Sequence, residues 1–235
     1  MKIILVDERI SDKCERALRK EGFRVIMLPA DPDLGQAVKS HPDTLIFKLE
    51  DELITTADYC DIASYIFSDL RELCHVKISF TSDRRSDKYP FDASMNGLIV
   101  CKSLFINTKS ASSFIINRAR ELGYTVCHTN QGYPACTTLA FGNYAITADR
   151  GMAKTLTERG IKVTLISEGH ISLPPHKYGF IGGASFVQDN KVYFFGDITS
   201  HPDYETIQLA LQKAEYEAIS LSDEPLCDFG GAIIL

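Results

Sequence analysis

The sequence predicts an α/β protein built by repetition, because one short structural unit recurs along the chain although its letters change each time. Each unit reads as two apolar strands joined by a tight turn, then a helix, then a third strand. Four first strands begin near residues 43, 96, 137 and 183. A fifth unit is complete only if Gly231–Leu235 pairs with Ile3–Val6, so we expect the two ends of the sequence to lie side by side.

Capping residues place the helix of each unit. Ser11 is a favourable N-cap, and the helix from Ser11 to Glu21 ends before Gly22, a residue that tolerates the backbone of a helix C-terminus. The same signals predict helices over Ser110–Leu122, Asp149–Arg159 and Ala57–Leu73, and one that begins at Pro202 and ends near residue 214. Tight turns between the first two strands are expected at Glu50-Asp51, Gly142-Asn143 and Asp189-Asn190.

Composition indicates one globular domain over residues 1–235, since 45% of the residues are hydrophobic and a chain of this length can bury a sizeable core. The seven cysteines contain no Cys-x-x-Cys pair, and their odd number favours a reducing compartment, so we expect a cytoplasmic protein. No apolar run reaches the roughly eighteen residues of a membrane span. A formal charge of −6 argues against a nucleic-acid partner.

Five strand–strand–helix–strand units, the last completed by both ends, resemble the pentein or guanidino-group-modifying fold, a five-bladed pseudo-symmetric α/β propeller. Within that fold the chain is similar to a bacterial family of unassigned function through four motifs, at Gly179–Ser185, Phe195–Asp197, His201–Asp203 and Asp228–Gly231. An ordinary doubly wound sheet with a nucleotide crevice is the alternative, but no strand is followed by Gly-x-Gly-x-x-Gly.

The resemblance implies that the beginnings of the first strands converge on a central channel. Its hydrolases and amidinotransferases use a channel cysteine as nucleophile, a His-x-Asp or His-x-Glu pair for proton transfer, and further carboxylates for a guanidinium. On this basis the expected catalytic residues are Cys136, His41 and Asp43. The expected substrate-binding residues are Asn96, Thr137, Gly183, Ser185 and Asp228. No metal and no cofactor is expected.

The chain departs from the family pattern at the nucleophile. The family cysteine follows a Gly-Gly pair in the last unit, whereas the segment from Asp228 to Leu235 contains no cysteine. His41-Pro42-Asp43 has the wording of the His-x-Asp motif but belongs to the second unit. Cys136 could replace the missing thiol because the units are pseudo-symmetric, and the alternative is a buried structural thiol.

Four further polar segments have plainer interpretations. His201-Pro202-Asp203 is expected to start a helix, and Arg84-Arg85 to lie in a charged surface loop. The stretch from Glu168 to Lys177 reads as a solvated connector in preference to a lid. Asp7 and Arg9 are expected to pair or to cap a helix, with no ligand implied.

Two classes of function remain open. The first is a cysteine-dependent hydrolase or amidinotransferase-like enzyme, acting on a guanidino, amidino or amide metabolite. The second is a non-catalytic binding protein that kept the propeller and lost the chemistry. The polar residues expected at the channel favour a small polar or cationic metabolite as the partner, and fold analogy alone does not choose between the two classes.

Overall fold

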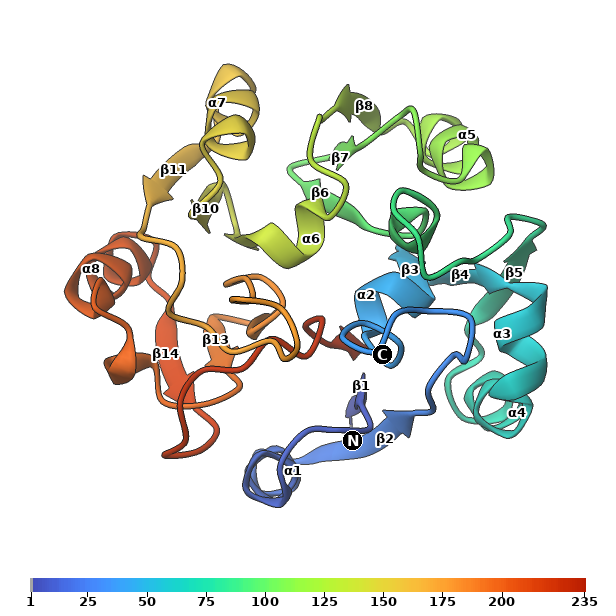
Figure 1. The fold of residues 1–235 in the computed structure, drawn as a ribbon, viewed down its shortest axis with the longest axis horizontal. Coiled ribbons are helices and arrows are strands. Elements are labelled where there is room, and N and C mark those ends of the chain that lie inside the picture. Colours follow the sequence, from blue (N-terminus) through green and yellow to red (C-terminus); the bar gives the residue numbers. More distant parts are fainter. Residues whose placement is uncertain (1) are drawn as a thin grey trace.

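The computed structural model describes residues 2–235, which form five three-stranded sheets arranged around a common centre (Figure 1). In each sheet the middle strand pairs antiparallel with one neighbour and parallel with the other. The longer helices lie at the periphery, each connecting the middle strand to the parallel one. The predicted order of strand, strand, helix and strand is therefore confirmed, as is the five-bladed arrangement.

The elements run as follows. The first unit contains β15 (Ile233–Ile234), β1 (Lys2–Asp7), α1 (Asp12–Lys20) and β2 (Phe23–Leu28). The second contains α2 (Pro42–Leu45), β3 (Ile46–Leu49), β4 (Glu52–Thr56), α3 (Ala57–Ile62), α4 (Ser64–Cys74) and β5 (Lys77–Thr81). The third contains η1 (Phe91–Ala93), β6 (Gly97–Val100), β7 (Ser103–Ile106), α5 (Ser113–Glu121) and β8 (Thr125–His128).

The fourth unit contains α6 (Pro134–Thr137), β9 (Thr138–Phe141), β10 (Tyr144–Thr147), α7 (Arg150–Glu158) and β11 (Lys162–Leu165). The fifth contains β12 (Ser185–Gln188), β13 (Lys191–Phe194), η2 (Ile198–Ser200), α8 (Tyr204–Lys213) and β14 (Glu217–Ser220). No helix within residues 2–235 is long and apolar enough to cross a membrane.

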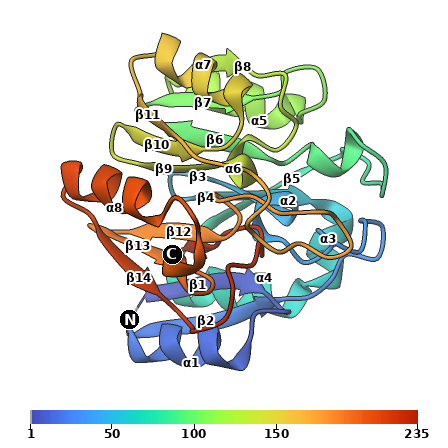
Figure 2. The ribbon, with the colours of Figure 1, turned by 60° about the vertical axis from the view of Figure 1, so that its left-hand side comes forward.

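The first sheet is built from both ends of the sequence (Figure 2). Strand β15 pairs antiparallel with β1, with Ile4 opposite Ile234 and Leu5 opposite Ile233. The backbone amide and carbonyl of Ile3 add two hydrogen bonds to Leu235, at 3.1 and 2.9 Å. The Ile233 side chain is buried, whereas Ile234 and Leu235 are half-buried. The predicted pairing of the two ends is confirmed.

Local signals fixed most helix ends and turns. The Ser11 hydroxyl accepts a hydrogen bond from the amide of Cys14, as an N-cap should. The three expected turns contain residues with positive φ, at Glu50, Gly142 and Asp189. The expected single helix over Ala57–Leu73 is instead two helices, α3 and α4, separated at residue 63.

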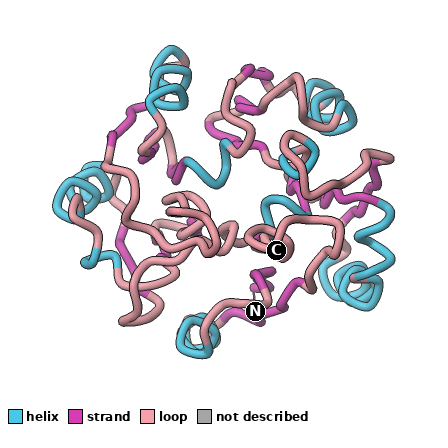
Figure 3. Tube along the Cα trace, in the orientation of Figure 1, coloured by secondary structure: helices cyan, strands magenta, loops and turns pink. Residues whose placement is uncertain are grey.

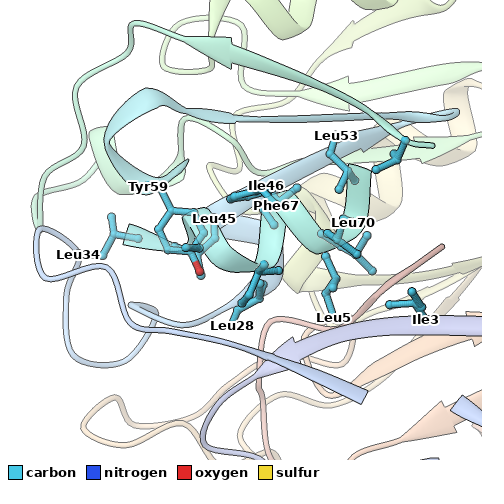
Figure 4. Close-up of a cluster of buried hydrophobic side chains, with 14 residues drawn as sticks. Ile3, Leu5, Leu28, Leu34, Leu45, Ile46, Leu53, Tyr59, Phe67 and Leu70 are labelled. Atoms are coloured by element: carbon cyan, nitrogen blue, oxygen red, sulfur yellow. The ribbon is translucent and has the colours of Figure 1, made fainter. Parts of the chain in front are cut away.

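That break has a packing reason. It allows Tyr59 of α3 and Phe67 of α4 to enter the same core, with ring centroids 6.3 Å apart in an edge-to-face arrangement. Their rings join Leu45, Leu5 and Leu28 in a cluster that fills the space between the first and second units (Figure 4). Packing of adjacent units against each other is what fixes the ring.

The predicted first strands begin one to three residues later than expected, and two of them follow a helical turn. Residues 43–45 and 137 were expected to be extended, but Pro42–Leu45 and Pro134–Thr137 each form one helical turn before the strand. Proline has the fixed φ of a first helical position and lacks the amide that would be unpaired there, which explains both turns. The two turns lie at the centre of the molecule (Figure 3), where they present His41, Asp43 and Cys136.

Candidate functional site

A cavity of about 660 Å³ opens at the centre of the ring. His41, Cys136 and Asp228 lie close together in its wall, and we call these three residues, together with Asp43 behind the Cys136 thiol, the floor. They come from three different units, which is the convergence that the resemblance implied. The remaining wall includes three tyrosines and several charged side chains, namely Tyr89, Tyr133, Tyr178, Asp87, Asp92, His176 and Lys177.

The thiol of Cys136 contacts the carboxyl group of Asp43. The Sγ atom donates to Asp43 Oδ2 at 2.6 Å and accepts from Asn96 Nδ2 at 3.4 Å. Asn96 is itself held in place, because its Oδ1 accepts from the amide of Ala135 at 2.8 Å. Burial raises the pKa of the Cys136 thiol well above its usual range, and the adjacent carboxyl groups of Asp43 and Asp228 raise it further.

The imidazole of His41 is fully buried, and neither ring nitrogen has a hydrogen-bond partner among residues 2–235. Nδ1 lies 3.9 Å from Asp228 Oδ1, and Nε2 lies 3.8 Å from Asp7 Oδ2. Burial, aided by the charge of Arg9, lowers the pKa of His41 to about 3, so the ring is neutral at physiological pH. Its unprotonated ring nitrogen is therefore free to bind a ligand or to accept a proton, because no donor among residues 2–235 is bonded to it.

The carboxyl group of Asp228 is oriented by the backbone. Its two oxygens accept hydrogen bonds from the amides of Phe180 and Gly230, at 2.9 and 3.0 Å. Gly230 has a φ of +68°, and a side chain there would come within 2.4 Å of His41 Cβ, so only glycine fits between these groups. Burial raises the pKa of Asp228 to about 7 and that of Asp43 to about 8.

Two expected binding residues point elsewhere. The Thr137 hydroxyl donates to backbone carbonyls of its own turn, and the Ser185 hydroxyl donates to the carbonyl of Ile181 at 2.6 Å. Their hydroxyl groups are thus already used within the fold. Gly183 contributes no side chain to the site. A Cβ atom there would lie 1.9 Å from Asp228 Oδ1, so only glycine leaves room for the Asp228 carboxyl group.

Sequence reasoning missed the layer behind His41. Asp7 is fully buried and its Oδ2 lies 2.6 Å from an Arg9 guanidinium nitrogen, while Arg9 also donates to the carbonyls of Gln36 and Ala37. The expected pairing of Asp7 with Arg9 is present. Its place beside His41 was not foreseen, although a charged residue at the end of a buried strand was an available signal.

Two other expectations need correction. The Arg85 side chain does not lie in a charged surface loop, because it is 4% exposed and forms an ion pair with Asp31 at 3.0 Å. The segment around Pro175 is not a mere connector, because Leu173 and residues 175–178 line the cavity wall. By contrast, His201 accepts from the amide of Asp203 just before α8, as a helix start requires.

A model of the family described as "Family of unknown function (DUF6873)" matches residues 5–233. None of the curated proteins matches the sequence. Solved structures do match. DDAH (dimethylarginine dimethylaminohydrolase) from Pseudomonas aeruginosa, complexed with citrulline, has a TM-score of 0.59 at 10% identity, covering 94% of this chain and 91% of that one.

Inosamine-phosphate amidinotransferase from Streptomyces griseus has a TM-score of 0.58 at 15% identity, covering 95% of this chain and 79% of that one. Agmatine deiminase from C. jejuni has a TM-score of 0.56 at 7% identity, covering 94% and 87%. At such low identity these similarities establish the pentein fold and leave activity to be argued from the site.

Proposed function

Because the chain belongs to the family of unknown function DUF6873 and has the pentein fold, we propose that its central cavity binds a small cationic metabolite bearing a guanidino or amidino group. The observation that carries this proposal is the floor itself. Asp43 Oδ1 and both ring nitrogens of His41 are buried without a hydrogen-bond partner among residues 2–235. Buried polar groups left unpaired are costly, so a ligand that donates N–H groups to the Asp228 carboxyl group and to the unprotonated nitrogen of His41 fits this end of the cavity.

The cavity wall suits such a ligand. Tyr89, Tyr133 and Tyr178 offer aromatic faces, which attract guanidinium and ammonium groups. Asp87 and Asp92 add two carboxyl groups along the same wall. Asp228 would contact the cation directly, and Asp43 would add its charge from behind the Cys136 thiol. Solved relatives whose titles name citrulline, agmatine and amidino transfer support this ligand class.

The proposed reaction is hydrolysis or transfer of the amidino group through Cys136. Once the bound cation has ionised Asp43, the thiol proton passes to Asp43 and the thiolate attacks the guanidino carbon. The carbon–nitrogen bond breaks as the leaving amine takes that proton from Asp43. Water then attacks the amidino carbon as its proton passes to His41, the carbon–sulfur bond breaks, and the thiolate takes the proton from His41. Asn96, which donates to Sγ, would stabilise the thiolate.

A non-catalytic binding protein is the second candidate, and one observation favours it. The free site raises the pKa of Cys136, whereas a resident nucleophile normally has a lowered one. The enzyme reading therefore requires the ligand's positive charge to bring the thiol pKa down once the cavity is filled.

A thermal-shift panel of arginine, agmatine and dimethylarginine tests the proposal. A ligand present at a hundred times its Kd should stabilise the native state by about 2.7 kcal/mol. Asp43→Asn should abolish the shift, while Asp189→Asn, which changes an exposed carboxylate, should keep it. If wild-type protein responds to none of these compounds, the small-cation proposal is wrong.

Product analysis then separates the two candidates. A hydrolase releases ammonia or an amine together with a ureido product, whereas an amidinotransferase releases an amine and forms a new guanidino compound from an added acceptor amine. Cys136→Ala should stop either reaction while ligand binding persists. Binding without any turnover in wild-type protein would establish the binding-protein alternative.

A further inference from the structure

We infer that His41, Cys136 and Asp228 form a three-ligand binding site for one thiophilic divalent cation, best matched by Zn²⁺. This inference stands apart from the proposed function, although both use the floor. It also departs from the sequence-based expectation of a site without metal.

The geometry leaves room for a single ion. One ligand atom from each of His41, Cys136 and Asp228 lies within 4.8 Å of the other two. A tetrahedral zinc ion with bonds of about 2.0–2.3 Å places its ligands roughly 3.3–3.8 Å apart, so small inward shifts would complete the site. A planar guanidinium is too large to sit among these three atoms, and would occupy the cavity above them.

Asp43 supports the site from outside the three ligands. Its Oδ2 accepts the thiol hydrogen of Cys136 at 2.6 Å, which orients the sulfur atom. When zinc binds, the thiol proton leaves to solvent together with any proton that the Asp228 carboxyl group still holds. The bound cation would then offset the negative charge of the buried thiolate and carboxylate.

The donor set selects among metals. A thiolate together with an imidazole favours zinc, whereas magnesium and calcium prefer sites made only of oxygen ligands. Every donor is buried, yet all three residues of the cluster line the cavity, so an ion has a route of entry.

The surroundings of His41 match the outer layer of a metal site. Its Nδ1 faces Asp228, and its Nε2 faces the buried carboxylate of Asp7 at 3.8 Å. A carboxylate that accepts a hydrogen bond from the far side of a ligating imidazole fixes its tautomer and orientation, and Asp7 would take this role if the 3.8 Å separation shortened on metal binding. Arg9 holds Asp7 in that position with an ion pair of 2.6 Å. The imidazole, which has no partner of its own, thus has a defined direction in which to bind.

Zinc and cobalt titrations of the full-length chain, after treatment with a chelator, test the site. We expect one equivalent of Zn²⁺ to bind, and Co²⁺ in its place to give a thiolate-to-cobalt charge-transfer band in the near ultraviolet. Cys136→Ser should remove that band. His41→Ala should weaken zinc binding by roughly a hundredfold or more, at least the loss seen on removing an outer-layer partner.

Cys101→Ser is the matched control, because Cys101 is an exposed thiol far from the floor in the fold and the one most open to stray metal. It should keep both the stoichiometry and the band. A band that survives Cys136→Ser, or one that disappears with Cys101→Ser, would overturn the assignment.

A measurement on the wild-type protein avoids the question of whether a variant folds. Zinc X-ray absorption should find one sulfur at about 2.3 Å together with nitrogen or oxygen ligands. A shell without sulfur, or with two or more, would refute the site. Zinc binding in a protein that ignores every guanidino compound would sustain this inference while the proposed function fails, and the reverse result would do the opposite.

Discussion

Two buried aspartates in this molecule have opposite surroundings. The side chain of Asp31 is 3% exposed; its Oδ2 pairs with an Arg85 guanidinium nitrogen at 3.0 Å and its Oδ1 accepts from the amide of Asp33. Asp43 is half-buried as a residue, but its Oδ1 atom is buried with no partner among residues 2–235, and its Oδ2 receives only the thiol of Cys136.

The two aspartates show how a carboxyl group buried for stability differs from one buried for binding. At Asp31 the fold supplies a guanidinium from its own sequence, and Arg85 is secured further by the Leu45 carbonyl and the face of Tyr59. At Asp43 the corresponding cation is missing. Burial without a partner, more than burial itself, is what marks the floor as a place for a ligand.

The largest expected effect tests the partnered side of this comparison. Arg85→Ala should lower the free energy of unfolding by about 3–5 kcal/mol, because it leaves the Asp31 carboxylate buried without its cation. Chemical denaturation measures this loss. Arg84→Ala, at the exposed neighbouring residue, should change stability by no more than about 0.5 kcal/mol. Equal stability of the two variants would show that the Arg85–Asp31 pair is not structural.

The unpartnered side should respond in the opposite direction. The free energy of unfolding of Asp43→Asn is compared with that of wild type in metal-free protein. The substitution should be about 2 kcal/mol more stabilising at pH 8 than at pH 6.5. Burial raises the pKa of Asp43 from 3.8 to about 8, so its native carboxyl group keeps a proton that the unfolded chain releases. Its contribution to stability is therefore present at low pH and is lost as pH rises toward 8.

His41 does not contribute to this difference. Its pKa is about 3 in the native state and 6.5 in the unfolded chain, so its titration affects wild type and Asp43→Asn alike and cancels when the two are compared at each pH. Asp31→Asn provides the contrast and should destabilise at both pH values. A gain that does not grow between pH 6.5 and 8 would contradict the assigned protonation of Asp43.

The affinity for a ligand should also depend on pH, with a smaller change in free energy. Below pH 7 the affinity of metal-free protein for agmatine should rise about tenfold per pH unit for each proton displaced, equivalent to about 1.4 kcal/mol. The reason is that burial raises the pKa of Asp228 to about 7, and a cation requires the ionised form. Calorimetric titrations between pH 5.5 and 8 measure the slope. An affinity independent of pH would place the cation away from the floor.

The smallest effect concerns a hydroxyl that the fold already uses. Ser185→Ala should cost about 1 kcal/mol of stability, since it removes the hydrogen bond to Ile181, and should leave agmatine affinity unchanged. Paired denaturation and binding measurements decide it. If affinity falls as well, Ser185 belongs to the binding surface after all.

Much of the fold was readable because its signals are local. Apolar periodicity, helix caps and turn residues fixed the repeated unit, and counting strands predicted the pairing of β15 with β1. The same repetition predicted that His41, Cys136 and Asn96 would meet, since each precedes a first strand. What they do there remains a proposal.

The remainder depended on contacts that no local pattern records. Pro42 and Pro134 impose a helical turn inside what reads as a strand, and that turn decides where the Thr137 hydroxyl points. Arg85 pairs with Asp31, which lies 54 residues away in the sequence, so no local pattern predicts that Arg85 is buried. The role of residues 175–178 likewise depends on the cavity that they line, which the local sequence does not reveal.

The pairing of β15 with β1 also has a kinetic consequence. Ile4 and Ile234 are the most distant partners in the registers of the five sheets, and closing so long a loop costs about 3 kcal/mol more entropy than closing a ten-residue hairpin. Asp228 and Gly230 lie on the segment that makes this contact, so the floor should form among the last steps of folding. A chain with four finished blades would already be compact and still be unable to recognise its ligand.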